Sequence, residues 1–234
     1  MDSTALTKAL IDAFPFTPTG AQEKALRTLA VFFDYESEKA VFVLKGFAGT
    51  GKTTLIGALV QSIAKLRYKT VLMAPTGRAA KVMAAYANRP ACTIHKRIYF
   101  TQQERQGNLK FKLQKNKFKR TLFLVDEASM IANQQQQSKL FENGSLLQDL
   151  IAYVRAGENC KLMFVGDTAQ LPPVHTNLSP ALDAQVLSLD FDLAPQEVEL
   201  DEVVRQAKDS GILFNATRIR QQLHNQHTDQ FQFI

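Results

Sequence analysis

The sequence lacks the features that mark secreted, membrane-spanning and disulfide-stabilised proteins. Only two cysteines are present, Cys92 and Cys160, and they do not have metal-ligand spacing. A reduced, cytoplasmic protein is therefore expected. Residues 1–4 have neither the basic nor the apolar region of a signal peptide. The longest apolar runs, such as Ala40–Leu44, are far too short to span a bilayer, which predicts no membrane association.

The balance of residues is that of an ordinary soluble globular protein. Hydrophobic residues make up 45% and charged residues 21% of the chain, which excludes disordered and fibrous classes. A length of 234 residues suits one large α/β domain, with or without a small insertion. No internal repeat of solenoid period is present.

Positive charge is concentrated in one segment. Between His95 and Arg120 there are nine Lys/Arg residues and a single acid, Glu104, so the net charge of this segment is +8. The net charge of the whole chain is only +6. The remainder of the chain is therefore slightly acidic. Such a segment is either a local surface for a polyanion or a solvated basic loop, and charge alone does not decide between them.

Short apolar runs alternate with helical stretches along the chain. The runs predicted as strands are Ala40–Leu44, Thr70–Ala74, Thr121–Val125 and Lys161–Val165, and the stretches predicted as helices are Thr53–Leu66, Gly77–Ala87 and Leu146–Ala156. Because the strand runs are apolar throughout, they suit strands buried on both faces of a parallel sheet. The pattern predicts an open α/β fold that binds its ligand at the carboxyl ends of the strands.

One segment interrupts this alternation. Ile98–Phe100 and Leu109–Leu113 flank Gln106-Gly107-Asn108, and the second run alternates apolar and basic residues. A turn signal between two such runs predicts a β-hairpin, projecting from the sheet within residues 97–119. Beyond Val203 the chain shows a helical pattern and no further strand–loop–helix unit.

The loop after the first strand has the pattern G-x-x-x-x-G-K-[ST], here Gly46-Phe47-Ala48-Gly49-Thr50-Gly51-Lys52-Thr53. It follows a strand and opens a helix, as phosphate binding requires: glycines let backbone N–H groups surround the phosphates, and the helix N-terminus favours negative charge. Lys52 is predicted to reach the β- and γ-phosphates, and Thr53 to place its hydroxyl on Mg²⁺. The ATP-binding residues predicted here are Gly46, Ala48, Gly49, Thr50, Gly51, Lys52, Thr53 and Thr54.

Two later strands also end in polar residues. Asp126-Glu127 follows Thr121–Val125, and Gly166-Asp167-Thr168-Ala169-Gln170 follows Lys161–Val165. Asp126 is predicted to hold Mg²⁺ and Glu127 to accept a proton from the attacking water, although such a pair can also be a helix-start charge pair. Gln170 is the candidate for contact with the γ-phosphate.

Six motifs in order resemble the N-terminal, RecA-like motor domain of superfamily 1 DNA helicases, in the RecD-like and Dda-like branch. They are Gly46–Thr54, Ala74–Ala80, Thr93-Ile94-His95, Asp126–Met130, Gly166–Val174 and Val204-Arg205-Gln206, and the resemblance covers about residues 16–220. It implies an ATP-dependent DNA helicase with ATP and Mg²⁺ as its ligands, and movement 5′ to 3′ along the strand.

The resemblance also implies roles for further residues. Gln22 resembles the family's adenine-reading glutamine, and Arg205 its phosphate-sensing arginine; the alternatives are a helix start capped by Thr19 and a surface ion pair. Thr76, Gly77 and Arg78 resemble a loop that contacts phosphates of single-stranded DNA, and His95 a strand-contacting position. The full set predicted to bind DNA is Thr76, Gly77, Arg78, Thr93, His95, Lys96, Tyr99, Phe100, Lys110 and Lys112.

The basic hairpin occupies the place of the family's duplex-splitting pin. Its cations would hold phosphates, and Tyr99, Phe100, Phe111 or Phe118 would stack on bases at about 1–3 kcal/mol per base. Half of these aromatics are expected to pack the hairpin onto the body instead.

A helicase of this class needs a second RecA-like domain, and nothing after Arg205 resembles one. We therefore expect residues 1–234 to be an N-terminal fragment, with single-stranded DNA and junctions as partners. An arginine supplied by the second domain contributes about 10³–10⁵ to hydrolysis in related enzymes, so weak activity is expected of this chain alone. A regulatory P-loop ATPase without DNA and a non-catalytic nucleotide-binding module are the other function classes left open.

Overall fold

The computed structural model describes residues 3–65, 67–103, 109–131, 145–170, 179–202 and 204. Its centre is a six-stranded, all-parallel sheet in the order β3-β2-β6-β7-β1-β8. The strands are β1 (Ala40–Gly46), β2 (Lys69–Ala74), β3 (Ala91–Thr93), β6 (Thr121–Val125), β7 (Lys161–Gly166) and β8 (Ala194–Leu200). The predicted α/β fold with a parallel sheet is therefore confirmed.

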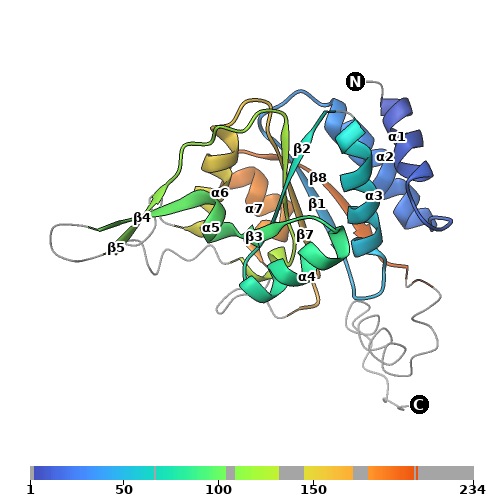
Figure 1. Ribbon diagram of the computed structural model, residues 1–234. Helices are drawn as coiled ribbons and strands as arrows, with labels where there is room; N and C mark the ends of the chain where they lie inside the picture. Colours follow the sequence, from blue (N-terminus) through green and yellow to red (C-terminus); the bar gives the residue numbers. More distant parts are fainter. Residues whose placement is uncertain are drawn as a thin grey trace, which may run out of the picture.

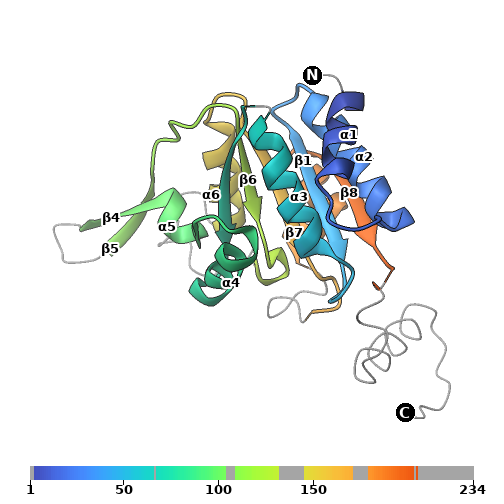
Figure 2. The ribbon, with the colours of Figure 1, turned by 45° about the vertical axis from the view of Figure 1, so that its right-hand side comes forward.

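Helices cover both faces of this sheet, as Figures 1 and 2 show. One face packs against α1 (Ser3–Asp12), α2 (Gly20–Asp34), α3 (Lys52–Lys65) and α4 (Gly77–Ala87). The other packs against α5 (Ile94–Ile98), α6 (Leu146–Arg155), α7 (Ala184–Leu189) and the short 3₁₀ turn η3 (Pro180–Leu182), with a second turn, η1 (Ala128–Met130), close by. No helix within the described ranges is long and apolar enough to cross a membrane.

The apolar strand runs are explained by this two-sided burial. In β1, Phe42 and Leu44 belong to the core beneath α1–α4, whereas Val41 and Val43 belong to the core beneath α5–α7. Because successive side chains of a strand point to opposite faces, a strand buried on both faces needs apolar residues at every position. All four side chains are fully buried.

The strand order places the predicted motifs together. β1 lies between β7 and β8, and β7 pairs in turn with β6. Lys45 is in register with Gly166, and Val125 with Phe164. The segments that leave β1, β7 and β6 therefore emerge side by side at one edge of the sheet.

The predicted hairpin is confirmed as a separate two-stranded sheet. Antiparallel β4 (Tyr99–Gln103) and β5 (Leu109–Leu113) pair from Tyr99↔Leu113 to Gln103↔Leu109, and they project away from the main sheet (Figure 1). Ile98 was expected in the first hairpin strand, but it ends α5 and is fully buried. The turn at residues 104–108 lies outside the described residues.

Several elements were not predicted. The short β3 has only three residues, and α5 follows it directly, so neither produces a periodic pattern. The edge strand β8 has the sequence Ala-Pro-Gln-Glu-Val-Glu-Leu, in which only Val198 and Leu200 are buried. Edge strands are often polar and can accept proline, so β8 lacks the apolar run by which the central strands were recognised.

Tyr99 anchors the hairpin to the body. Its side chain is only 5% exposed, and its hydroxyl donates to Oδ2 of Asp149, a fully buried carboxyl group of α6, at 2.5 Å. Gln114, just after β5, donates its side-chain amide to the Tyr99 carbonyl at 2.6 Å. The Tyr99 hydroxyl thus holds the root of the hairpin to α6, and Gln114 links the two ends of the hairpin.

Replacing Tyr99 by Phe should destabilise the protein by about 1–3 kcal/mol, because a buried carboxyl group loses a hydroxyl donor. Urea denaturation measures the change. Tyr35→Phe is the control, since the Tyr35 side chain is exposed and its loss of a hydroxyl should cost no more than about 0.5 kcal/mol. Equal stability of the two variants would contradict the anchoring role.

Candidate functional site

The loop between β1 and α3 adopts a conformation that depends on its glycines. Gly49 and Gly51 have φ angles of 83° and 90°, which residues with a Cβ rarely adopt. A Cβ at Gly51 would lie 2.4 Å from Nε2 of Gln22, and one at Gly46 would lie 2.8 Å from Oγ1 of Thr50. The loop is therefore a close-fitting backbone cradle that ends at the N-terminus of α3.

Neighbouring groups hold this cradle from several sides. The fully buried Thr50 donates its hydroxyl to the Phe47 carbonyl at 2.8 Å. Gln22 donates its side-chain amide to the Thr50 carbonyl at 2.9 Å, and the N–H of Val204 donates to the Gly49 carbonyl at 3.1 Å. The conformation of the loop is thus fixed by α2 and by the chain that follows β8.

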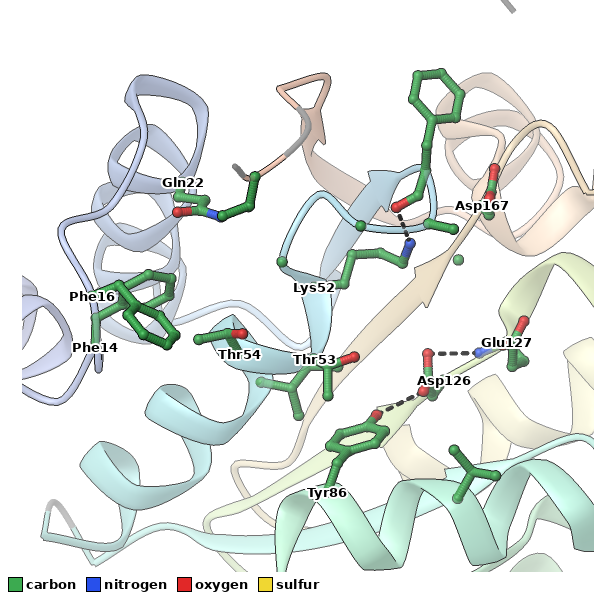
Figure 3. Close-up of a pocket in the computed structure, with 18 of the residues that line it drawn as sticks. Phe14, Phe16, Gln22, Lys52, Thr53, Thr54, Tyr86, Asp126, Glu127 and Asp167 are labelled. Atoms are coloured by element: carbon green, nitrogen blue, oxygen red, sulfur yellow. Dashed lines mark hydrogen bonds between the residues drawn. The ribbon is translucent and has the colours of Figure 1, made fainter. Parts of the chain in front are cut away.

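Lys52 and Thr53 begin α3 and face the same cavity (Figure 3). The Lys52 ammonium donates to the carbonyl oxygens of Gly46 at 2.6 Å and Phe47 at 2.9 Å, so the charge is held over the loop. The Thr53 side chain is exposed toward the cavity. A cation and a hydroxyl beside the backbone N–H groups of a helix start are the groups that bind phosphate and its metal ion.

Asp126 and Glu127 leave β6 opposite this loop. One Asp126 oxygen accepts from the Glu127 N–H at 2.9 Å and the other from the hydroxyl of Tyr86 at 2.6 Å. Glu127 itself has left-handed backbone angles, φ 54° and ψ 38°. Such angles cost a residue with a Cβ about 1–3 kcal/mol and occur preferentially at functional sites. Here the sharp turn brings the side chain of Glu127 into the cavity (Figure 3).

The surroundings of Glu127 suit it to accept a proton. Burial raises the pKa of this carboxyl group above its ordinary value, and the neighbouring charge of Asp126 raises it further. A hydrogen bond with Gln170 and the charge of Lys52 act in the opposite direction on the pKa of Glu127. A general base is most effective when its pKa lies closer to the working pH than that of a free carboxylate.

Tyr86 keeps its proton in this environment. Burial raises the pKa of the Tyr86 hydroxyl far above its ordinary value, and the adjacent Asp126 carboxylate adds to the effect. The hydroxyl therefore acts as a donor to Asp126. No sequence motif pointed to Tyr86, because its contact with Asp126 spans 40 residues.

The loop after β7 completes the acidic side of the cavity. Asp167 is 4% exposed, and its Oδ1 accepts from the N–H of Ala169 at 2.9 Å. Gln170 accepts a bond from the hydroxyl of Ser129 at 2.9 Å, and it also bonds to Glu127. Ser129, which lies in the Asp126–Met130 motif but had no predicted role, thus holds the amide of Gln170 beside the candidate base. The predicted stretch 171–174 lies outside the described residues, as does Arg205.

These groups line one cavity of about 580 Å³. The residues predicted to bind ATP, its metal ion or the attacking water that line it are Gln22, Ala48, Gly49, Gly51, Lys52, Thr53, Thr54, Asp126, Glu127 and Gln170. A cradle of N–H groups, one lysine, a threonine hydroxyl and a carboxylate form the donor set that a magnesium-bound triphosphate requires. The residues present therefore fit this ligand.

The far end of the cavity is aromatic. Phe14 and Phe16 lie beside Gln22 in Figure 3, and the Phe16 side chain is 63% exposed. Gln22 is 3% exposed, and besides its bond to Thr50 its Oε1 accepts from the N–H of Thr19 at 3.0 Å. The predicted Thr19 cap is present, since the Thr19 hydroxyl accepts from the N–H of Gln22. Gln22, the partner of Thr19 in this cap, also supports the phosphate loop. The two phenylalanines were not predicted, because no motif includes them.

The segments predicted to contact DNA leave adjacent strands. Thr76 caps α4 after β2, and Thr93 caps α5 after β3, with each hydroxyl accepting a backbone N–H. Ala74 is in register with Thr93, so the two helix starts are neighbours. Gly77, Arg78 and Lys96 are exposed. Burial lowers the pKa of His95, which keeps its ring neutral at neutral pH.

The aromatic residues of the hairpin region divide into buried and exposed ones. Tyr99 was predicted to contact DNA, but its ring is buried and bonded to Asp149, so it is not available to stack on a base. Phe111 and Phe118 pack against the core beneath α5–α7. Phe100 is 46% exposed and is the candidate for stacking, beside the exposed Lys112. The side chain of Lys110 is outside the described residues.

A phosphate loop between a buried strand and a helix, with acids at the ends of the adjacent strand β7 and of β6 beside it, defines the class of P-loop nucleoside triphosphatases. Within this class, the chain belongs to the family described as AAA domain, whose model matches residues 18–232. This membership agrees with the resemblance drawn from the ordered motifs.

The chain is also similar in sequence to curated relatives and in fold to solved structures. The chain is 30% identical over 196 residues to the ATP-dependent RecD2 DNA helicase of Deinococcus radiodurans, covering 84% of this chain and 24% of the relative. It is 33% identical over 120 residues to the multifunctional conjugation protein TraI of Escherichia coli K12, covering 49% of this chain and 6% of that protein. The chain thus spans less than a quarter of the length of either relative.

Among solved structures, Pif1 helicase from Bacteroides, in complex with ADP-AlF3 and single-stranded DNA, matches with a TM-score of 0.53 and 21% identity, over 92% of this chain and 48% of that one. Pif1 helicase from Candida albicans matches with a TM-score of 0.53 and 18% identity, over 86% and 44% of the two chains. At these identities the likeness establishes the fold alone.

The raised pKa of Glu127 predicts a pH-dependent change in stability. The folded protein holds this proton more tightly than the unfolded chain, so the contribution of Glu127 to the free energy of unfolding is greatest at low pH. That contribution falls as pH rises from the ordinary carboxyl pKa to the raised one.

Glu127→Gln, which carries no charge, should therefore melt at a higher temperature than the unmodified protein at mildly alkaline pH. At acidic pH, where Glu127 is protonated, the difference should become small. Differential scanning calorimetry in EDTA, which removes divalent cations, measures it. A variant that is less stable at alkaline pH would contradict the inferred surroundings of Glu127.

Proposed function

We propose that this chain is the ATP-hydrolysing motor domain of a DNA helicase. The observation that carries the proposal is the convergence of Lys52, Asp126 and Glu127 on one cavity beside two predicted DNA-contacting helix starts. The motif order, the family and the similarity to RecD2 support the helicase class. A whole helicase of this class requires a second RecA-like domain, which we expect in the full-length protein.

Each group of the cavity would have a separate role in ATP hydrolysis. Backbone N–H groups of the loop and the Lys52 ammonium hold the β- and γ-phosphates. Thr53 and Asp126 would hold Mg²⁺, which would supply positive charge beside the phosphate oxygens. Glu127 would accept the proton of the attacking water. Gln170, which bonds to Glu127, would contact the γ-phosphate. Arg205 remains the candidate for sensing the γ-phosphate.

Single-stranded DNA is proposed to lie along the starts of α4 and α5 and to reach the hairpin. The exposed Arg78 and Lys96 would bind phosphates of the strand, and the exposed Phe100 would stack on a base. Because His95 is neutral at neutral pH, its contribution would be a hydrogen bond or a stacking contact rather than a charge. Residues 97–119 would form the element that meets the junction between single-stranded and double-stranded DNA.

Glu127→Gln tests the enzymatic part of the proposal. The variant should bind ATP with unchanged affinity but turn it over about 10²–10⁴ times more slowly, because only proton transfer is lost. Binding is measured by calorimetry and turnover by phosphate release in the presence of oligothymidylate. A nucleotide-binding module would have no turnover to lose, and a DNA-independent switch would hydrolyse ATP equally fast without the oligonucleotide.

Replacing Lys110, Lys112, Lys115 and Lys117 together by Ala tests the proposed role of the hairpin. Binding of single-stranded DNA should weaken, and the slope of log affinity against log salt should become shallower by about 0.7 for each phosphate that the variant no longer neutralises. Fluorescence anisotropy at several salt concentrations measures the slope. A control of equal charge change replaces Lys8 of α1, Lys24 of α2, Lys39 before β1 and Lys65 of α3. An unchanged slope in the hairpin variant would favour a solvated basic loop.

A further inference from the structure

Asp126 is held at two points by one continuous segment of the chain. Its backbone N–H donates to the carbonyl of Met73, near the end of β2, at 3.0 Å. Its carboxylate accepts from the hydroxyl of Tyr86, near the end of α4, at 2.6 Å. Between these two contacts the segment runs through Thr76, Gly77 and Arg78. The candidate metal ligand is thus attached on both sides of the proposed DNA-contacting loop.

The geometry of this segment allows it to act as a rigid unit. Met73 is fully buried in the sheet, and α4 is an unbroken helix of 11 residues with Thr76 as its N-cap. From Thr76 to Tyr86 the helix is about 15 Å long, at about 1.5 Å per residue. A shift at the start of α4 therefore moves Tyr86, and with it the hydroxyl that contacts Asp126.

The start of α4 is exposed and basic, while its end is packed. Arg78 and Lys81 are exposed, and Met83, on the inner face, is fully buried. Tyr86 is half-buried against the core beneath α1–α4, and it lines the nucleotide cavity together with Asp126 (Figure 3). One helix thus presents charge to a polyanion at its N-terminal end and a hydroxyl to the nucleotide site near its C-terminal end.

We propose that Tyr86 is a positioning residue that couples occupancy of the α4 start by single-stranded DNA to the orientation of the Asp126 carboxylate. The proposal rests on the proposed function, since it needs both ligands. Coupling between two binding sites is reciprocal: if DNA changes the affinity for magnesium-bound nucleotide by some factor, the nucleotide changes the affinity for DNA by the same factor. The coupling can therefore be measured by binding alone.

The test compares full-length wild-type protein with Tyr86→Phe, which keeps the packed ring and removes only the hydroxyl. Fluorescence anisotropy of labelled oligothymidylate gives the DNA affinity without nucleotide, and then with Mg²⁺ and a non-hydrolysable ATP analogue. The ratio of the two affinities in wild-type protein is expected to differ from one by about 5- to 150-fold, in either direction. In Tyr86→Phe the ratio should lie within about twofold of one, while the affinity for DNA without nucleotide stays unchanged.

Tyr68→Phe serves as the control. Tyr68 is also half-buried against the same core, but it lies before β2 at the opposite end of that strand. This variant should retain the wild-type ratio, and a loss equal to that of Tyr86→Phe would overturn the proposal. So would a Tyr86→Phe protein with the full wild-type ratio. Failure of the proposed function has a different signature, since wild-type protein would then lack DNA-stimulated ATP hydrolysis.

Discussion

Parallel pairing of β6, β7 and β1 brings three strand ends to one edge of the sheet, and the predicted phosphate, metal and water groups of the nucleotide cavity depend on this adjacency. The phosphate loop, the Asp126-Glu127 pair and the Asp167–Gln170 loop come from segments that are far apart in the sequence. The sheet can hold them together because both of its faces are covered by helices, so that its strands are buried and apolar throughout. A change in strand order would separate the candidate base from the phosphates.

The parts of the fold with strong local signals could be predicted from the sequence. The central strands were recognisable because two-sided burial makes every position apolar, and the phosphate loop because Gly49 and Gly51 adopt angles that favour glycine. β3 and β8 could not be recognised in this way, since one is very short and the other is a polar edge strand. The hairpin was recognised, but Ile98 was assigned to it although it belongs to the preceding helix.

The site was predictable to the extent that its chemistry is carried by motifs. Contacts between distant residues were not: Tyr86 meets Asp126, Ser129 meets Gln170, and Tyr99 meets Asp149 only after folding. Each contact changes the interpretation of a motif residue. Tyr99 becomes an anchor rather than a base-stacking residue, and Gln22 becomes a support of the phosphate loop as well as a candidate reader of the nucleotide. A side chain's role thus depends on partners that sequence spacing does not reveal.

The central claim is that nucleotide hydrolysis in this cavity responds to DNA bound along α4, α5 and the hairpin. The most direct measurement is the rate of ATP hydrolysis by the full-length protein as single-stranded oligothymidylate is titrated from zero to saturation, with Mg²⁺ present. The account predicts a rate that rises with bound DNA and reaches a plateau at least about tenfold above the DNA-free rate, equivalent to about 1.4 kcal/mol in the barrier. A measurable rate that is the same with and without DNA would contradict it.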